Sequence, residues 1–210
     1  MAGASCGPAP IHQETAIKHP SLKIIRDEHA SLAAMLRSMT MMVERGPGDN
    51  PEQFFDVLRA MLFYIDEFPE RLHHPKESDL LFPRVVRAVP SLMALVQKLE
   101  CDHMNGEKAV RELQHLLLAW ELLGEPRRPD FAARCREYVA FYLEHMRQEE
   151  TAILPEAEKV LSDAEWQELD AAFARNCDPL TGKYPPDPAY DRLFTRIVMR
   201  APAPIGLGER

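Results

Sequence analysis

Apolar residues recur in alternating steps of three and four along four long segments of this chain, which is the spacing of helices that turn one face to a protein core. The segments cover residues 21–45, 52–88, 91–123 and 130–161 of the 210-residue sequence. The connections between them are short, and short connections favour antiparallel neighbours. The pattern therefore predicts an all-α fold, an up-down bundle of four helices.

Capping and turn residues mark the ends of these helices. Asn50 can cap the second helix, and Gln53 can reach back to complete a capping box. Gly124 suits the end of the third helix. Within the second helix, Pro69 and Pro75 each remove a backbone donor and crowd the carbonyl four residues earlier, so we expect a kink or a break near the HHP segment.

Further segments flank the bundle. We expect residues 1–19 to be a flexible leader, and residues 20–175 to hold the bundle and a short fifth helix that begins with a capping box at Ser162. Residues 176–210 contain too many prolines for a long helix. We expect them to form a proline-rich tail that packs on the bundle, with one or two helical turns within 190–198.

Composition narrows the class of protein. Apolar residues make up 46% and charged residues 28% of the chain, as in ordinary globular proteins. A net charge of −8 argues against general binding to nucleic acid or to anionic lipid. No stretch resembles a membrane span or a secretory signal, so we expect a cytoplasmic protein. The four cysteines are far apart, which disfavours a zinc knuckle or a dithiol motif.

Histidines within the apolar stripes indicate a metal site. A buried imidazole needs hydrogen-bond partners or a metal to offset its lost hydration, so four at once favour a metal over four separate core histidines. Two of them are followed four residues later by a glutamate, one turn along on the same helix face. The candidate ligands are His29, His73, Glu77, His103, His145 and Glu149.

These positions fall within two or three turns of one depth in an up-down bundle. Imidazoles with carboxylates that can bridge suit a pair of borderline cations, and iron is favoured over manganese or zinc. The ferritin-like plan differs, because there Glu precedes His by three residues. The ten methionines are interpreted as core packing and not as a copper site.

The chain also resembles a known family, the hemerythrin-like HHE cation-binding proteins of bacteria. The likeness rests on RDEH at His29, YIDEFPERLHHPKESDLLFP around His73, DHMNGE at His103 and YLEHMRQEETAILP around His145. It covers residues from about 20 to 175. The resemblance implies two iron ions with an oxo or hydroxo bridge, the four histidines as terminal ligands, and Glu77 and Glu149 as bridges.

Two departures from the oxygen-carrying members of that family affect the expected site. Those proteins place a second histidine four residues after the one on the third helix, where this chain has Glu107, which becomes an additional candidate ligand. They bridge with an acid five residues after the histidine of the fourth helix, so Glu150 competes with Glu149. These departures make reversible binding of oxygen a weaker expectation for this chain. Iron-centre repair proteins of the family resemble this site more closely, but they usually bring a cysteine-bearing amino-terminal domain, and here only Cys6 precedes the bundle.

Neighbours of the candidate ligands leave further alternatives open. His74 could replace His73 as a ligand, because Pro75 alters the local geometry, or it could support a ligand from outside. Asp102 could orient a neighbouring ligand. Buried tyrosines could donate to a bound oxygen species, but aromatic residues at helical spacing are more often core. These are Tyr64, Tyr138 and Tyr142.

The sequence thus predicts a di-iron protein that binds or handles O2, NO or peroxide, or that supplies iron under oxidative or nitrosative stress. The alternatives are a metal-responsive sensor or interaction module, and a di-iron enzyme such as an NO reductase or a peroxidase. No nucleic-acid or membrane partner is expected. The redox partner and the oligomeric state stay open, a homodimer included.

Overall fold

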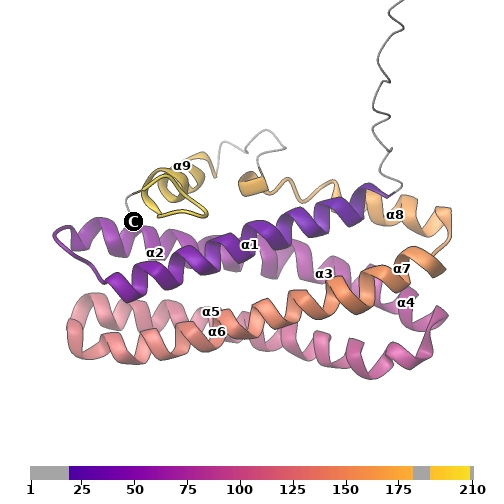
Figure 1. Ribbon diagram of the computed structural model, residues 1–210, viewed down its shortest axis with the longest axis horizontal. Coiled ribbons are helices and arrows are strands. Elements are labelled where there is room, and N and C mark those ends of the chain that lie inside the picture. The colour runs from indigo at the N-terminus through magenta and orange to yellow at the C-terminus, as the bar shows by residue number, and fades with distance from the viewer. Residues whose placement is uncertain (1–18, 182–189, 209–210) are drawn as a thin grey trace, which may run out of the picture.

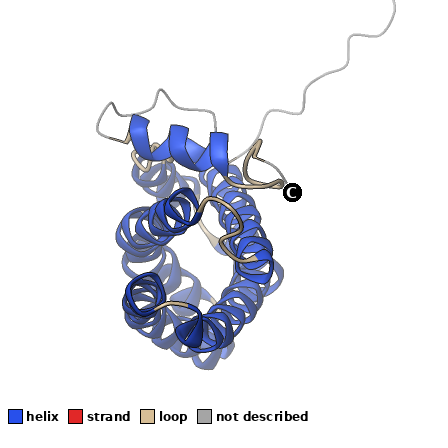
Figure 2. Cartoon of the chain, turned by 90° about the vertical axis from the view of Figure 1, so that its left-hand side faces the viewer, coloured by secondary structure: helices blue, strands red, loops and turns tan. Residues whose placement is uncertain are grey.

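Four long helical rods, antiparallel in sequence order, form the body of the molecule (Figures 1 and 2). A computed structural model describes residues 19–181 and 190–208. The first rod is α1 (Pro20–Arg45), the second runs from α2 (Pro51–Ile65) to α4 (Phe82–Ala88), the third is α5 (Met93–Leu123), and the fourth runs from α6 (Arg128–Gln148) to α7 (Leu154–Val160). The all-α, up-down bundle expected from the sequence is confirmed.

The second and fourth rods contain π-helical turns, which are one residue wider than α-helical turns. In the second rod these are η1 (Asp66–His73) and η2 (Glu77–Leu81), with the short α3 (His74–Lys76) between them, and in the fourth rod the turn is η5 (Glu149–Ile153). Of the kink or break expected near HHP, a break is wrong, because the helix continues through this segment with π-helical turns. The carbonyl that a proline crowds, four residues back, is accommodated by widening the turn.

Local signals account for the ends of the helices. The Asn50 side chain accepts a hydrogen bond from the Gln53 amide at 3.2 Å. Gly124, with φ of 82°, ends α5. The capping box at Ser162 begins α8 (Asp163–Phe173), the expected fifth helix. Short 3-10 turns, η3 (Pro90–Leu92) and η4 (Glu125–Arg127), precede the third and fourth rods.

Two shorter helices cover the outside of the bundle. Helix α8 packs on α1, and α9 (Asp191–Arg200) packs on α2 at the other end of the molecule (Figure 1). His19, expected within the leader, instead precedes α1 directly and stacks on Trp166 with ring centroids 4.3 Å apart. The rest of the expected leader, residues 1–18, lies outside the described residues.

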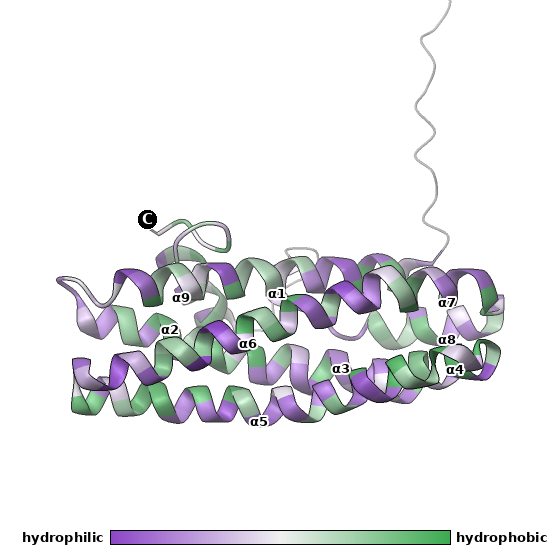
Figure 3. Cartoon of the chain, turned by 60° about the horizontal axis from the view of Figure 1, so that its bottom comes forward, coloured by the Kyte–Doolittle hydropathy of each residue, from purple (hydrophilic) through white to green (hydrophobic). Residues whose placement is uncertain are grey.

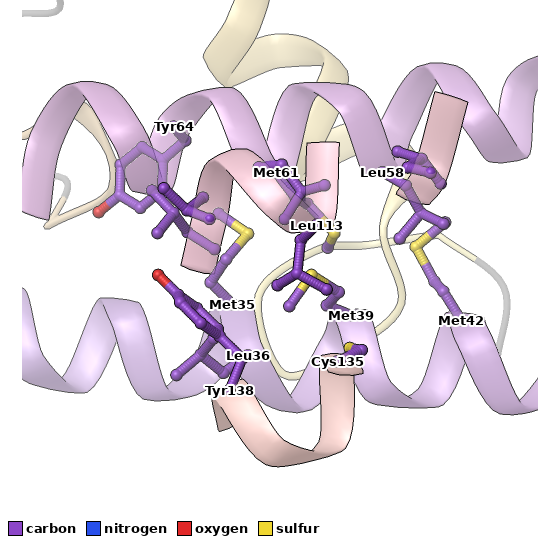
Figure 4. Close-up of a cluster of buried hydrophobic side chains, with 14 of the residues drawn as sticks. Met35, Leu36, Met39, Met42, Leu58, Met61, Tyr64, Leu113, Cys135 and Tyr138 are labelled. Atoms are coloured by element: carbon purple, nitrogen blue, oxygen red, sulfur yellow. The ribbon is translucent and has the colours of Figure 1, made fainter. Parts of the chain in front are cut away.

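Apolar side chains fill the bundle in two separate clusters. The larger cluster joins α1, α2, α5 and α6 and includes Met35, Met39 and Met61, so these methionines pack the core (Figure 4). The smaller cluster lies toward α4, α7 and α8 and includes Phe82 and Trp166. Apolar and polar positions alternate along each rod, as Figure 3 shows. Among the described residues, no helix has the length and apolar content needed to cross a membrane.

Candidate metal centre

A polar layer separates the two apolar clusters. On every rod it lies between the residues of the larger cluster and those of the smaller one, so the candidate ligands share one depth in the bundle. All six side chains are buried, and Glu77 and Glu149 are fully inaccessible to solvent. The six are His29, His73, Glu77, His103, His145 and Glu149. The sequence predicted that the ligands lie at about the same depth in the bundle, and in the folded chain they lie in one layer.

The four imidazoles form two pairs, and each pair comes from one helical hairpin. In the first hairpin, residues 20–88, His29 Nε2 lies 3.2 Å from His73 Nε2. In the second hairpin, residues 93–160, His103 Nε2 lies 3.1 Å from His145 Nε2. The Nε2 atoms of two histidines are therefore close together at two positions in the layer, one position for each hairpin.

The two glutamates lie between these pairs, and each turns one oxygen toward each pair. Glu77 Oε1 is 3.2 Å from His73 Nε2, and its Oε2 is 3.6 Å from His103 Nε2. Glu149 Oε2 is 3.4 Å from His29 Nε2, and its Oε1 is 3.1 Å from His145 Nε2. Each carboxylate is therefore oriented to bridge two positions.

These donors fit metal ions on two independent grounds. Both oxygens of Glu77 and of Glu149 are buried and have no hydrogen-bond partner, which is costly unless a cation binds them. Donors at right angles on one ion, each about 2.1 Å from it, lie about 3 Å apart, which is close to the separations seen here. The six side chains offer two nitrogens and two oxygens at each position, so a six-coordinate ion held by them alone would keep two places for other ligands.

Hydrogen bonds on the outside of the imidazoles hold them in this orientation. Each ring directs Nδ1 to an oxygen of another side chain, which favours the tautomer whose Nε2 is free to bind a metal. The contacts are His29 with Glu150 Oε1 at 3.1 Å, His73 with Glu28 Oε2 at 2.6 Å, His103 with Ser78 Oγ at 2.9 Å, and His145 with Asp102 Oδ2 at 3.5 Å.

These orienting residues follow a rule along the chain. Glu28 and Asp102 each directly precede the first histidine of a hairpin and contact the second histidine of the same hairpin. Ser78 and Glu150 each follow a glutamate of the layer and contact the first histidine of the opposite hairpin. A neighbour in sequence lies about 100° around the helix, so it faces the adjacent rod. This adjacency was the available signal for Glu28 and Ser78, which sequence reasoning missed.

His74 adds a fifth buried imidazole to the layer. Its ring stacks on that of His103 with centroids 4.2 Å apart, and one of its nitrogens lies within 4.8 Å of the donor atoms of Glu77, His103 and His145. Burial, with the neighbouring histidines, holds the pKa of His74 well below its usual value. His74 therefore joins His73 in the layer and does not replace it.

A second buried polar group lies behind His74. The Glu70 carboxylate accepts hydrogen bonds from the hydroxyls of Tyr142 and Tyr138, and its Oε2 lies 3.1 Å from His74 Nδ1. Burial raises the pKa of Glu70 to about 7, although the two tyrosine hydroxyls oppose the rise. Gly106 on α5 leaves room for this group, because a Cβ there would overlap the Tyr142 hydroxyl.

Two alternative candidates lie away from the donor atoms of the layer. Glu107 is half exposed and pairs with Arg111 at 2.6 Å, so the structure does not bring it to the imidazoles as a ligand. Although Glu107 lies one turn after His103, its carboxylate pairs with Arg111 on the surface. Glu150 is 41% exposed and contacts only the outer nitrogen of His29, whereas Glu149 lies among the imidazoles.

The proton affinities of the layer reflect its two carboxylates. Burial opposes protonation of His73, but Glu77 and Glu28 outweigh it and raise the pKa of this imidazole well above its usual value. Burial also opposes protonation of His145, and Glu149 outweighs it in the same way. The pKa of Glu149 lies well below its usual range, since the histidines outweigh burial. The layer thus favours positive charge beside the Glu149 carboxylate.

A small cavity of about 20 Å³ adjoins the first pair of imidazoles. Its walls include the rings of His29 and His73, the apolar side chains of Leu32, Phe68 and Leu72, and several polar side chains. This volume admits one water-sized molecule. The histidines of the second hairpin do not line it.

Comparison with known proteins places most of the bundle in one family. The family model described as Hemerythrin HHE cation binding domain matches residues 21–157, well over half of the chain. That range contains all the candidate ligands and all the orienting residues described above. No curated protein matches the sequence significantly.

Proposed function

Because the chain belongs to the hemerythrin HHE cation-binding family, we propose that its polar layer holds two iron ions and reacts with O2, NO or peroxide. His29 and His73 would bind one ion, and His103 and His145 the other. Glu77 and Glu149 would bridge them.

One observation carries this proposal, namely two fully buried glutamates that present four unpaired oxygens to two pairs of imidazole nitrogens. Two ionised carboxylates with no hydrogen bond would be very costly in a core without cations beside them. Mixed imidazole and carboxylate donors suit iron better than calcium or magnesium, which prefer oxygen donors alone.

When bound, two ferrous ions would supply electrons and open coordination positions for such a ligand. The side chains would do the rest. Apolar residues above and below the layer exclude bulk water, and the cavity beside His29 and His73 admits only a small molecule. The orienting bonds at Nδ1 keep Nε2 directed inward.

Turnover of the ligand is a second candidate, and the Glu70 group supports it. Burial raises the pKa of Glu70 to about 7, so its carboxyl group can exchange a proton near neutral pH. Its Oε2 lies 3.1 Å from His74 Nδ1, so Glu70 can take up or release a proton beside the layer, which is the general acid and base behaviour that reduction of O2, peroxide or NO requires. Supply of iron to other proteins is less well supported, because every ligand is buried.

Metal analysis tests the proposal directly. Protein produced with iron should contain two irons per chain and show the charge-transfer absorption of a bridged ferric pair. Substitution of His73 or His145 by Ala should lower the iron content sharply. His115→Ala, which alters an exposed histidine of α5, is the matched control and should change nothing. Iron well below one per chain in the unmodified protein would refute the proposal.

Stopped-flow spectra of the reduced, iron-loaded protein separate binding from turnover. A stable adduct with NO or O2 supports a binding protein. Repeated consumption of NO or peroxide in the presence of a chemical reductant supports an enzyme, and Glu70→Gln should then slow turnover without lowering the iron content.

A further inference from the structure

The chain that follows α8 reaches back into the bundle beside the polar layer. Asn176 and Asp178 are buried there, whereas Cys177 between them is exposed and has a φ of 47°. Both buried residues line the cavity next to His29 and His73. They lie beyond residue 157, where the match to the family ends.

Asn176 connects this segment to a candidate ligand through one carboxylate. Its Nδ2 donates to Glu28 Oε2 at 2.9 Å, and the same oxygen lies 2.6 Å from His73 Nδ1. The Asn176 Oδ1 accepts a hydrogen bond from Lys76, three residues after His73. Within the described part of the chain Glu28 has no other hydrogen-bond partner, since its Oε1 is buried and unpaired. The orientation of Glu28 therefore depends on Asn176.

Asp178 anchors the same segment to the wall of the cavity. It accepts a hydrogen bond from the Tyr64 hydroxyl at 2.6 Å and another from the Leu180 amide at 2.9 Å. Tyr64 lies on α2 and is itself a cavity wall. Two side chains of one short segment thus fix two neighbours of the first imidazole pair.

Among the residues that the structure describes, none from outside the family-matched region gives comparable support to the second imidazole pair. His103 is oriented by Ser78, and His145 by Asp102, which Lys98 holds from the preceding turn of α5. All of these residues belong to the bundle itself. Support from the C-terminal segment is therefore confined to one side of the centre.

We propose that residues 176–178 are a positioning element for one of the two metal positions, with Asn176 acting through Glu28 on His73. This inference rests on the proposed di-iron function. Residues that orient a ligand in this way typically change metal affinity 10- to 100-fold when they are removed. Loss of the Asn176 amide should weaken the position of His29 and His73 and leave the position of His103 and His145 unchanged.

Release of iron to a ferrous chelator under anaerobic conditions tests this inference on the full chain. In Asn176→Ala, one ion per chain should leave about tenfold faster than in the unmodified protein, and the other ion at the original rate. Asn176→Asp retains the size and the acceptor for Lys76 but lacks the donating amide, so it should show the same single fast phase if the Ala variant does not fold. Ser78→Ala should accelerate the other ion, and the double variant with Asn176→Ala should accelerate both.

Asp170→Ala is the matched control for general loosening of the C-terminal region. Asp170 on α8 accepts hydrogen bonds from the Ser21 amide at 2.8 Å and the Ser21 hydroxyl at 2.6 Å and does not touch the polar layer. Equal acceleration of both ions in the Asn176 variants, matching the effect of Asp170→Ala, would overturn the inference, as would unchanged release of both. If the unmodified protein fails to bind two ions, the proposed function fails first and the positioning role with it.

Discussion

Replacement of Gly106 by Ala tests the packing behind the metal layer without changing any candidate ligand. The added Cβ would overlap the hydroxyl of Tyr142 and lie 2.7 Å from its Cζ and 3.0 Å from Glu70 Oε1. The contacts with the Tyr142 hydroxyl and Cζ are far shorter than ordinary contact distances, so the Tyr142 ring must move. Its movement would break the hydrogen bond to Glu70 and shift the ring away from His74, on which it stacks at 5.6 Å.

Three effects set the size of the change in the free energy of unfolding. Overpacking in a core costs about 1–3 kcal/mol. Loss of a hydrogen bond to a buried charged acceptor costs about 1.5–3 kcal/mol. Ala is favoured over Gly inside a helix by about 1 kcal/mol, which acts in the opposite direction. We expect Gly106→Ala to destabilise the protein by about 3 kcal/mol.

Urea unfolding of the chelator-treated protein, followed by circular dichroism, measures this change without a contribution from metal. A double-mutant cycle with Tyr142→Phe assigns its cause. Without the hydroxyl, the first overlap is gone, so Gly106→Ala should cost at least about 1 kcal/mol less in that background. A Gly106→Ala variant as stable as the original protein, or equal costs in both backgrounds, would refute the described packing.

Further substitutions separate the roles of neighbouring residues. Glu149→Gln should abolish binding of the ion pair, whereas Glu150→Gln should only weaken metal affinity by about 10- to 100-fold in a competition titration; equal losses would contradict their assignment. His74→Ala should alter the absorption spectrum of the iron-loaded protein, and Glu107→Ala should leave it unchanged. Between pH 4.5 and 7 the folded protein retains a proton on Glu70 that the unfolded chain has lost, so stability from this residue falls as the pH rises through about 7. Chelator-treated Glu70→Gln should therefore gain up to about 3 kcal/mol on the original protein at pH 8 and nothing at pH 4, by urea unfolding; a gain that does not depend on pH would exclude this explanation.

The long helices and the donors on them follow from the sequence, because both depend on local periodicity. An apolar stripe with a histidine in it already specifies which face of the helix turns inward. The capping residues Asn50 and Ser162 likewise act within one turn, so the helix ends are predictable within a few residues.

What the sequence did not reveal depends on contacts between distant segments. The prolines near HHP predicted a kink or a break, but the helix continues there and contains wider π-helical turns. His74, which the sequence offered as a replacement for His73, lies in the layer together with it. Asn176 reaches Glu28 across 148 positions of the chain, and no local pattern indicates such a contact.

The assignment of one imidazole pair to each helical hairpin has a consequence for the history and the chemistry of the centre. Each hairpin contributes an acid and a histidine on its first rod and His-x-x-x-Glu on its second, so exchanging the hairpins leaves the donor set unchanged. The centre has the internal symmetry of a dimer but is encoded in one chain. In a dimer of two identical hairpins, one mutation would change both metal positions. In this chain a mutation in one hairpin leaves the other hairpin unchanged. The halves already differ at equivalent positions. Ser78 of the first hairpin corresponds to Glu150 of the second, and His74 corresponds to Met146. Two metal positions with matching donors are thereby free to differ in their surroundings and in their chemistry.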